Sequence, residues 1–168
     1  MHNRACKGIT LLEMVIVCAV ASIIVAISGI AWQKASANRK MDAAIAELEA
    51  GLALARQTAQ NHDGAYIVFH VSSNDSDSTW ELFPGSAKAT EKEPKVLSHT
   101  IPRVLNVSFS PAATTIIQFN SAGSLDKDVS PFNSSGNCEI NISIGGSNRK
   151  TTLTIVGMTG AVVKNVIN

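Results

Sequence analysis

The feature that most constrains this 168-residue chain is an apolar run close to its N-terminus. From Ile9 to Trp32 nearly every residue is apolar, and the polar exceptions are Thr10, Glu13, Ser22 and Ser28. A run of about 20 such residues is long enough to cross a bilayer as a helix. The sequence therefore predicts a transmembrane helix over 9–32, with room behind it for one folded domain of about 100 residues.

A secretory signal peptide is the competing interpretation of this N-terminus. Arg4 and Lys7 form a positively charged start, and Ala35-Ser36-Ala37 has the small residues of a signal cleavage site. The apolar run is longer than the roughly 7–15 residues of a signal peptide, however, and it contains an acid near its beginning. Both properties favour a membrane anchor.

Glu13 is the most informative residue of the run. An ionised acid inside hydrocarbon costs at least about 2.5–3.5 kcal/mol, so it is expected to have a cationic partner. Arg4 and Lys7 lie a turn or more away on the cytoplasmic side. Cleavage of the Gly8–Ile9 bond would create an α-ammonium group on Ile9, which the Glu13 carboxylate of a neighbouring subunit could bind.

The segment Lys7-Gly8-Ile9-Thr10-Leu11-Leu12-Glu13-Met14-Val15-Ile16-Val17 resembles the signal of type IV prepilins and type II secretion pseudopilins. The resemblance implies that residues 1–8 are a leader, that a prepilin peptidase cleaves after Gly8, and that Ile9 is N-methylated. It also implies the Glu13 contact during assembly. Ile9 stands where the family usually has phenylalanine.

The same resemblance implies a location and partners. The precursor would be a single-pass protein of the bacterial inner membrane, with its N-terminus in the cytoplasm and its C-terminal domain in the periplasm. Its partners would be the prepilin peptidase, other pilin or pseudopilin subunits and the assembly platform, and its destination a pilus or pseudopilus.

An amphipathic pattern follows the apolar run and predicts that the helix continues over 33–63. The apolar positions of this stretch alternate at spacings of four and three residues, which places them on one helical face. These positions are Met41, Ile45, Leu48, Leu52, Ala55 and Ala59. Gly64 supplies a stop signal.

From residue 64 to residue 168 the period changes to two, which predicts a β-sheet domain. The expected strands are 66–71, 79–83, 104–109, 114–119, 138–144, 151–156 and 160–164, with a hairpin at the Gly145-Gly146-Ser147-Asn148 turn. One long helix packed on an antiparallel sheet is an α+β, pilin-like arrangement.

A narrower resemblance, to the GspH/FimT family, rests on three further stretches. They are residues 46–59 of the helix, the Phe119-Asn120-Ser121-Ala122-Gly123 turn, and the closing pair of strands over 154–162. The resemblance implies a minor pilin or a minor pseudopilin. Some members bind DNA through an arginine-rich motif beside the last glycine turn, where this chain has Gly160-Ala161-Val162-Val163-Lys164 and no arginine.

Arg149, Lys150 and Lys164 form a small candidate basic edge. Arg149 and Lys150 follow the glycine turn, and Lys164 lies on the expected neighbouring strand. Such an edge could contact DNA or another polyanion by charge alone. Solvated charges that discourage edge-to-edge aggregation explain the same residues. The formal net charge of +1 gives no global field that would favour a polyanion.

The sequence contains no constellation typical of an enzyme, so we expect no catalytic site and no cofactor. His62, His70 and His99 are scattered and are interpreted as solvated side chains, and no metal site is expected. Asn74-Asp75-Ser76-Asp77-Ser78 could offer oxygen ligands to calcium but lacks other EF-hand residues, which favours a hairpin turn. Cys138 is expected to be buried and inert.

The leading prediction from the sequence is therefore a structural, non-enzymatic subunit of a pilus or a type II secretion pseudopilus. A pilin that captures DNA for uptake is the first alternative, and an adhesin or enzyme domain on an uncleaved anchor is the second. One N-terminal signal serves secretion pseudopili and pili alike, so the sequence leaves the choice of machine open.

Overall fold

The helix α1 runs from Leu11 to Asn61 and is the first element of the computed structural model. The structure describes residues 10–72, 77–88, 94–111, 115–130, 132–145 and 148–167, apart from the side chains at 27 and 30. The chain divides into two units, Met1–Ala37 and Asn38–Asn168, and α1 contributes to both. Each unit is described by itself.

From Leu11 to Trp32, α1 is mainly apolar, and the side chains that the structure describes there are exposed. It is long and apolar enough to cross a membrane, and none of its most apolar stretch is buried. The hydroxyl of Ser22 donates a hydrogen bond to the Ala19 carbonyl, and that of Ser28 donates one to the Ile24 carbonyl, each at 2.8 Å. These local bonds satisfy the serine donors without water, as a helix in hydrocarbon requires.

The part of α1 in the second unit is amphipathic, as the sequence predicts. The six residues of the expected stripe, from Met41 to Ala59, are completely buried. The helix ends in a Schellman arrangement, in which the Gly64 N–H donates to the Ala59 carbonyl at 3.0 Å. The left-handed residue of this end is Asp63, with φ of 57°, one position before the glycine that signals the stop.

Eight strands follow the helix among the described residues. They are β1 (Ala65–His70), β2 (Ser78–Pro84), β3 (Leu97–Ile101), β4 (Leu105–Ser110), β5 (Ile116–Phe119), β6 (Asn137–Ile144), β7 (Lys150–Val156) and β8 (Val162–Ile167). All pairings are antiparallel, and they form two four-stranded sheets with the orders β3-β2-β1-β5 and β4-β6-β7-β8.

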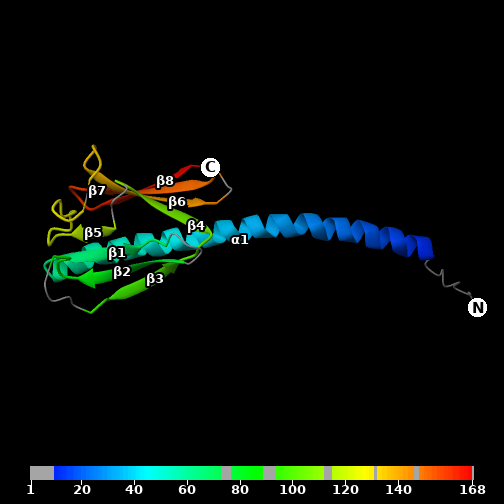
Figure 1. Cartoon of the computed structure of the whole chain (residues 1–168), viewed down its shortest axis with the longest axis horizontal. Helices are drawn as coiled ribbons and strands as arrows, with labels where there is room; N and C mark the ends of the chain where they lie inside the picture. The colour runs from blue at the N-terminus through cyan, green and yellow to red at the C-terminus, as the bar shows by residue number, and fades with distance from the viewer. Residues whose placement is uncertain are drawn as a thin grey trace, which may run out of the picture. The chain divides into compact units, whose positions relative to one another are not determined.

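The two sheets lie on either side of the C-terminal half of α1, as Figure 1 shows within the second unit. Trp80 of β2 packs against Gly51 of the helix, and Arg149, just before β7, pairs with Asp42. The buried faces of both sheets therefore share one core with the apolar stripe. This arrangement confirms the predicted fold class, a long helix packed on antiparallel β structure.

Several details of the strand prediction are corrected. The expected single sheet is divided in two, because β4 pairs with β6 while β5 returns to pair with β1. The edge strand β3 was not predicted, and the last strand begins two residues later than expected, after a turn over 157–160. The hairpin is confirmed, with Ser143 paired to Lys150. Cys138 of β6 is buried, as expected.

Candidate functional site

Thr10 and Glu13 together form the start of α1. The Thr10 hydroxyl accepts a hydrogen bond from the Glu13 N–H at 3.2 Å, and the Thr10 carbonyl accepts one from Met14 N–H at 3.2 Å. Thr10 is thus the N-cap, and Glu13 stands at the third helical position, where an acid suits a capping box and the helix dipole. The sequence analysis did not identify this cap, although the Thr-x-x-Glu spacing indicates one.

Glu13 is the only ionised side chain between Leu11 and Trp32. It is exposed, so the helix itself supplies no burial for its charge. Gly8 and Ile9, the predicted cleavage and methylation sites, lie outside the described residues. The predicted roles of all three residues therefore stay predictions.

The candidate basic edge is divided between the two faces of its sheet. Lys164 is opposite Leu153 in the β7–β8 pair and lies on the helix-facing side, whereas Lys150, three residues before Leu153, lies on the other side. Arg149 Nη2 contacts Asp42 Oδ1 at 2.7 Å, and Lys164 Nζ contacts Glu49 Oε1 at 3.6 Å. The three cations therefore do not form one surface, and two of them already pair with helix acids.

Two of the predicted solvated histidines have partners. The ring of His99 stacks on Trp80 at 5.1 Å, and His99 Nδ1 lies 3.3 Å from Glu47 Oε2. His70 Nε2 lies 3.9 Å from Glu81 Oε2. The prediction of a simply solvated ring was wrong for His99, because a period-two strand turns it toward the helix.

No metal site is apparent in the described part of the chain. It holds no group of three histidine, cysteine or acidic side chains that could bind an ion. Of the proposed calcium segment, residues 74–76 lie outside the described residues. The Asp77 carboxylate accepts a hydrogen bond from the Arg103 N–H at 2.8 Å, and the Ser78 hydroxyl accepts one from the Ser72 N–H at 3.2 Å.

Glu81, on the outer face of β2, has the clearest electrostatic environment. The hydrogen bond from Lys95 Nζ, at 2.9 Å, lowers the pKa of the Glu81 carboxyl below its ordinary value of 4.5 against the opposing effect of burial. The charges of Lys95 and His70 lower this pKa further. The Glu81 carboxylate therefore links β2 to the segment that leads into β3, through its contact with Lys95.

Replacing Glu81 by glutamine is expected to lower stability at neutral pH. A depressed folded-state pKa stabilises the folded state above the unfolded-state pKa, and this contribution is lost as the pH falls through the folded-state value. The difference in unfolding free energy between wild type and variant should therefore shrink on acidification below about pH 4.5. Urea titrations at several pH values measure this difference in unfolding free energy. Lys95→Gln should give the same profile, and a difference that is constant with pH would contradict the assignment.

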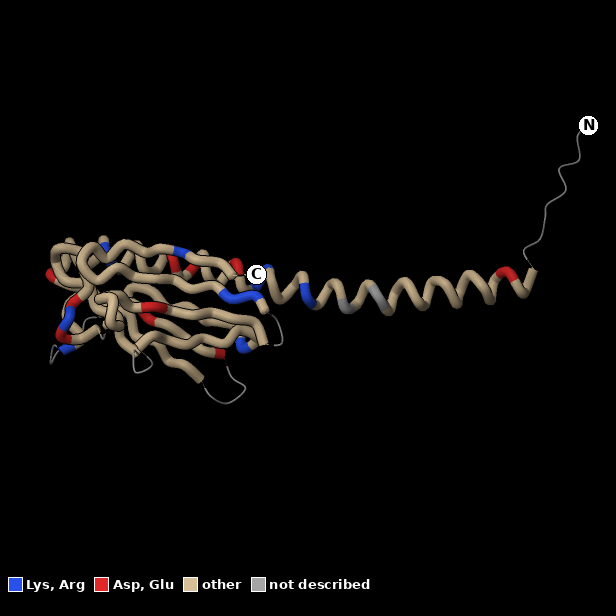
Figure 2. The backbone as a smooth tube through the Cα atoms, turned by 90° about the horizontal axis from the view of Figure 1, so that it is seen from above, with Lys and Arg blue, Asp and Glu red and all other residues tan. Residues whose placement is uncertain are grey.

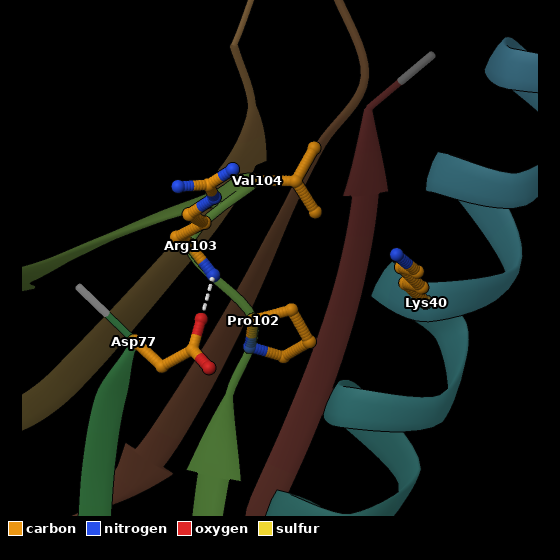
Figure 3. A pocket seen from close by; sticks show the side chains of 5 residues that line it. All are labelled: Lys40, Asp77, Pro102, Arg103 and Val104. Atoms are coloured by element: carbon orange, nitrogen blue, oxygen red, sulfur yellow. Dashed lines mark hydrogen bonds between the residues drawn. The ribbon is translucent and has the colours of Figure 1, made fainter. Parts of the chain in front are cut away.

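A shallow depression lies at the end of the second unit where α1 enters it. The depression has a volume of about 750 Å³ and is lined by Lys40, Asp77, Pro102, Arg103 and Val104. Figure 3 shows the Lys40 side chain on the helix and the Arg103 side chain on the turn between β3 and β4, with Pro102 and Val104 between them. The depression has two cations and one acid, and no arrangement for nucleophilic or acid–base catalysis.

Comparison with known proteins covers both parts of the chain. Residues 3–29 match the family model of the prokaryotic N-terminal methylation motif. A crystal structure of the type IV minor pilin FimU from Pseudomonas aeruginosa superposes with a TM-score of 0.57 and 17% identity, covering 76% of this chain and 90% of FimU. The chain is type IV pilin-like in motif and in fold.

A second crystal form of FimU agrees with this result, with a TM-score of 0.54, 18% identity, and coverage of 74% of this chain and 91% of FimU. No curated protein sequence matches the chain. At this level of identity, the likeness establishes the fold of the pilin-like chain. The matched motif contains Glu13 and most of the apolar run.

Proposed function

We propose that this chain is a minor subunit of a type IV pilus, stored as a precursor in the bacterial inner membrane and assembled through its N-terminal helix. The strongest support is the combination of a methylation motif over residues 3–29 with a fold likeness that covers 90% of FimU, a minor pilin. The motif points to processing, and the fold points to a filament subunit. The chain would turn over no substrate.

Processing begins at the leader. A prepilin peptidase removes residues 1–8 after Gly8 and methylates the new N-terminus at Ile9. Before that step, Arg4 and Lys7 hold the N-terminus in the cytoplasm, because basic residues favour the cytoplasmic side of a membrane helix. The apolar part of α1 then anchors the subunit, with its folded unit in the periplasm.

Glu13 aligns the subunit during assembly. Its charge is costly in hydrocarbon, and the apolar stretch of α1 offers no second ionised side chain to pair with it. The α-ammonium of Ile9 on a neighbouring subunit supplies the missing cation, and the low dielectric of the helix bundle strengthens the attraction. Other pilin subunits and the assembly platform are the partners that this step requires.

Two alternatives have weaker support. A minor pseudopilin of type II secretion would use the same signal, but the solved structures that match are those of a type IV minor pilin. DNA capture would use Arg149, Lys150 and Lys164, and two of these three cations pair with acids of α1. No surface with all three cations is available to a duplex.

The test is intact-mass and N-terminal analysis of the protein purified from host membranes, with and without the prepilin peptidase. We expect a chain that begins at methylated Ile9 only when both the peptidase and Gly8 are present, and full retention of the leader in Gly8→Val. Glu13→Gln should be processed normally but be lost from sheared filaments. A mature chain that keeps Met1, or that starts after Ala37, would contradict the proposal.

A further inference from the structure

The end of the second unit at which α1 enters is basic. We define this basic end by five residues: Arg39, Lys40, Arg103, Arg149 and Lys150. Strand register brings the ends of β4, β6, β7 and β8 together here, since Leu105 pairs with Ile144 and Lys150 pairs with Ile167. The Arg149–Asp42 contact at 2.7 Å fixes these strand ends beside the first helical turns of the unit.

Acids only partly neutralise the basic end. Asp42 and Asp77 are the acids that contact it among the described residues, which leaves five positive and two negative charges, a net of +3. Figure 2 shows blue segments gathered at this end, close to the C-terminus. The opposite end of the unit carries Asp63, Asp126 and Asp128 mixed with Lys88 and Lys127.

Lys40 and Arg103 differ from the three cations of this unit that pair with acids. Arg149, Lys164 and Lys95 each have a carboxylate within 4 Å, and in the described part of the chain Lys40 and Arg103 have none. Asp77 accepts the backbone N–H of Arg103 and so helps to hold the turn that presents the guanidinium. Two cations without acid partners therefore line one depression of about 750 Å³.

Lys40, the cation of this depression that lies on α1, follows closely after the apolar run that spans the membrane in the proposed function. Lys40 is eight residues after Trp32, and α1 is helical throughout, so the two residues are separated by about 12 Å along the helix. Headgroups extend roughly 5–7 Å beyond the hydrocarbon on each side. With Trp32 at the end of the hydrocarbon, Lys40 therefore lies along α1 within about one Debye length, roughly 8 Å, of the level of the lipid phosphates.

We propose that the depression between Lys40 and Arg103 binds the phosphate headgroup of an anionic phospholipid. The ammonium and guanidinium groups bind the phosphate oxygens, and Pro102 and Val104 contact the glycerol carbons. The remaining cations of the basic end add a longer-range attraction. This contact holds the folded unit on the membrane until the subunit is extracted into a filament, and it rests on the proposed membrane anchoring.

The test uses the full chain in lipid nanodiscs, with spin-labelled phosphatidylglycerol or phosphatidylcholine as the probe. We expect the protein to immobilise phosphatidylglycerol preferentially. Lys40→Gln with Arg103→Gln should reduce this preference, by up to about fivefold for each charge removed. The matched control is Lys88→Gln with Lys127→Gln, which removes the same charge at the opposite end and should leave the preference unchanged.

Other results would overturn the inference. Equal preference for the two lipids, or an equal loss in both double variants, excludes a site at the depression. Loss of the preference on adding inorganic phosphate at matched ionic strength would assign the site to a soluble anion. Binding of a DNA duplex that requires Lys40 and Arg103, without lipid preference, would assign it to nucleic acid. Failure of the chain to enter nanodiscs would contradict the proposed function itself.

Discussion

Replacing Gly160 by alanine is expected to lower the unfolding free energy of the second unit by about 2–5 kcal/mol. Gly160 has φ of 62°, and a left-handed conformation costs a non-glycine residue roughly 1–2 kcal/mol. An added Cβ would overlap the Gly123 carbonyl oxygen, a backbone atom that no side-chain rotation can move. Overpacking of this kind costs about 1–3 kcal/mol more.

Gly85→Ala is the matched control for this prediction. Gly85 has φ of 79°, but its added Cβ would have no atom within 4 Å. Gly85→Ala should therefore lower the unfolding free energy only by the cost of the left-handed backbone, about 1–2 kcal/mol. Urea titration read by pulse proteolysis measures both variants in the full chain. Equal losses would show that the turn at Gly160 relaxes away from Gly123, contrary to our expectation.

The second large effect concerns Trp80 and Gly51, which meet at the centre of the core. Trp80 is 1% exposed, and a Cβ on Gly51 would overlap the Cη2 atom of its ring. Trp80→Ala is expected to cost about 3–5 kcal/mol, as large aromatic deletions do. Gly51→Ala should also destabilise the wild type, because overpacking of about 1–3 kcal/mol exceeds the helix propensity gain of about 1 kcal/mol.

The sign of the Gly51 effect should reverse when Trp80 is absent. With alanine at 80 the contact is gone, and Gly51→Ala is left with its propensity gain of up to about 1 kcal/mol. The double-mutant cycle therefore has a coupling energy of roughly 1–3 kcal/mol. The same proteolysis assay measures all four proteins. Destabilisation by Gly51→Ala on both backgrounds would mean that a neighbour other than Trp80 requires the glycine.

Local pattern was sufficient to predict most of the secondary structure. The three-and-four spacing from Met41 to Ala59 identified the buried face of α1, because a helix can bury only one stripe against its sheets. Alternation of apolar residues identified most of the strands. The edge strand β3 alternates in burial, but its inward positions include the polar His99, and Ser98 and Thr100 are polar and exposed. The missed signal was therefore present but weak.

Long-range pairing could not be predicted from the sequence. The exchange of partners that puts β5 beside β1, and β4 beside β6, depends on contacts between segments tens of residues apart. The ion pairs of the candidate basic edge could not be predicted for the same reason. Arg149 and Asp42 are 107 positions apart, so charge counting along the strand gave no warning that the helix would neutralise it. Lys40 and Arg103, the two cations of the depression, lie in different parts of the chain, so spacing along the sequence could not bring them together.

The cap at Thr10 has a consequence for maturation. The hydrogen bonds that start α1, from the N–H groups of Glu13 and Met14, end on Thr10, which remains in the chain when the proposed cut removes residues 1–8. Precursor and product therefore share the same first helical turn, and processing needs no refolding there. In the proposed maturation only the charges at the N-terminus change. Arg4 and Lys7 leave with the leader, and the α-ammonium group of Ile9 is created next to the Thr10 cap.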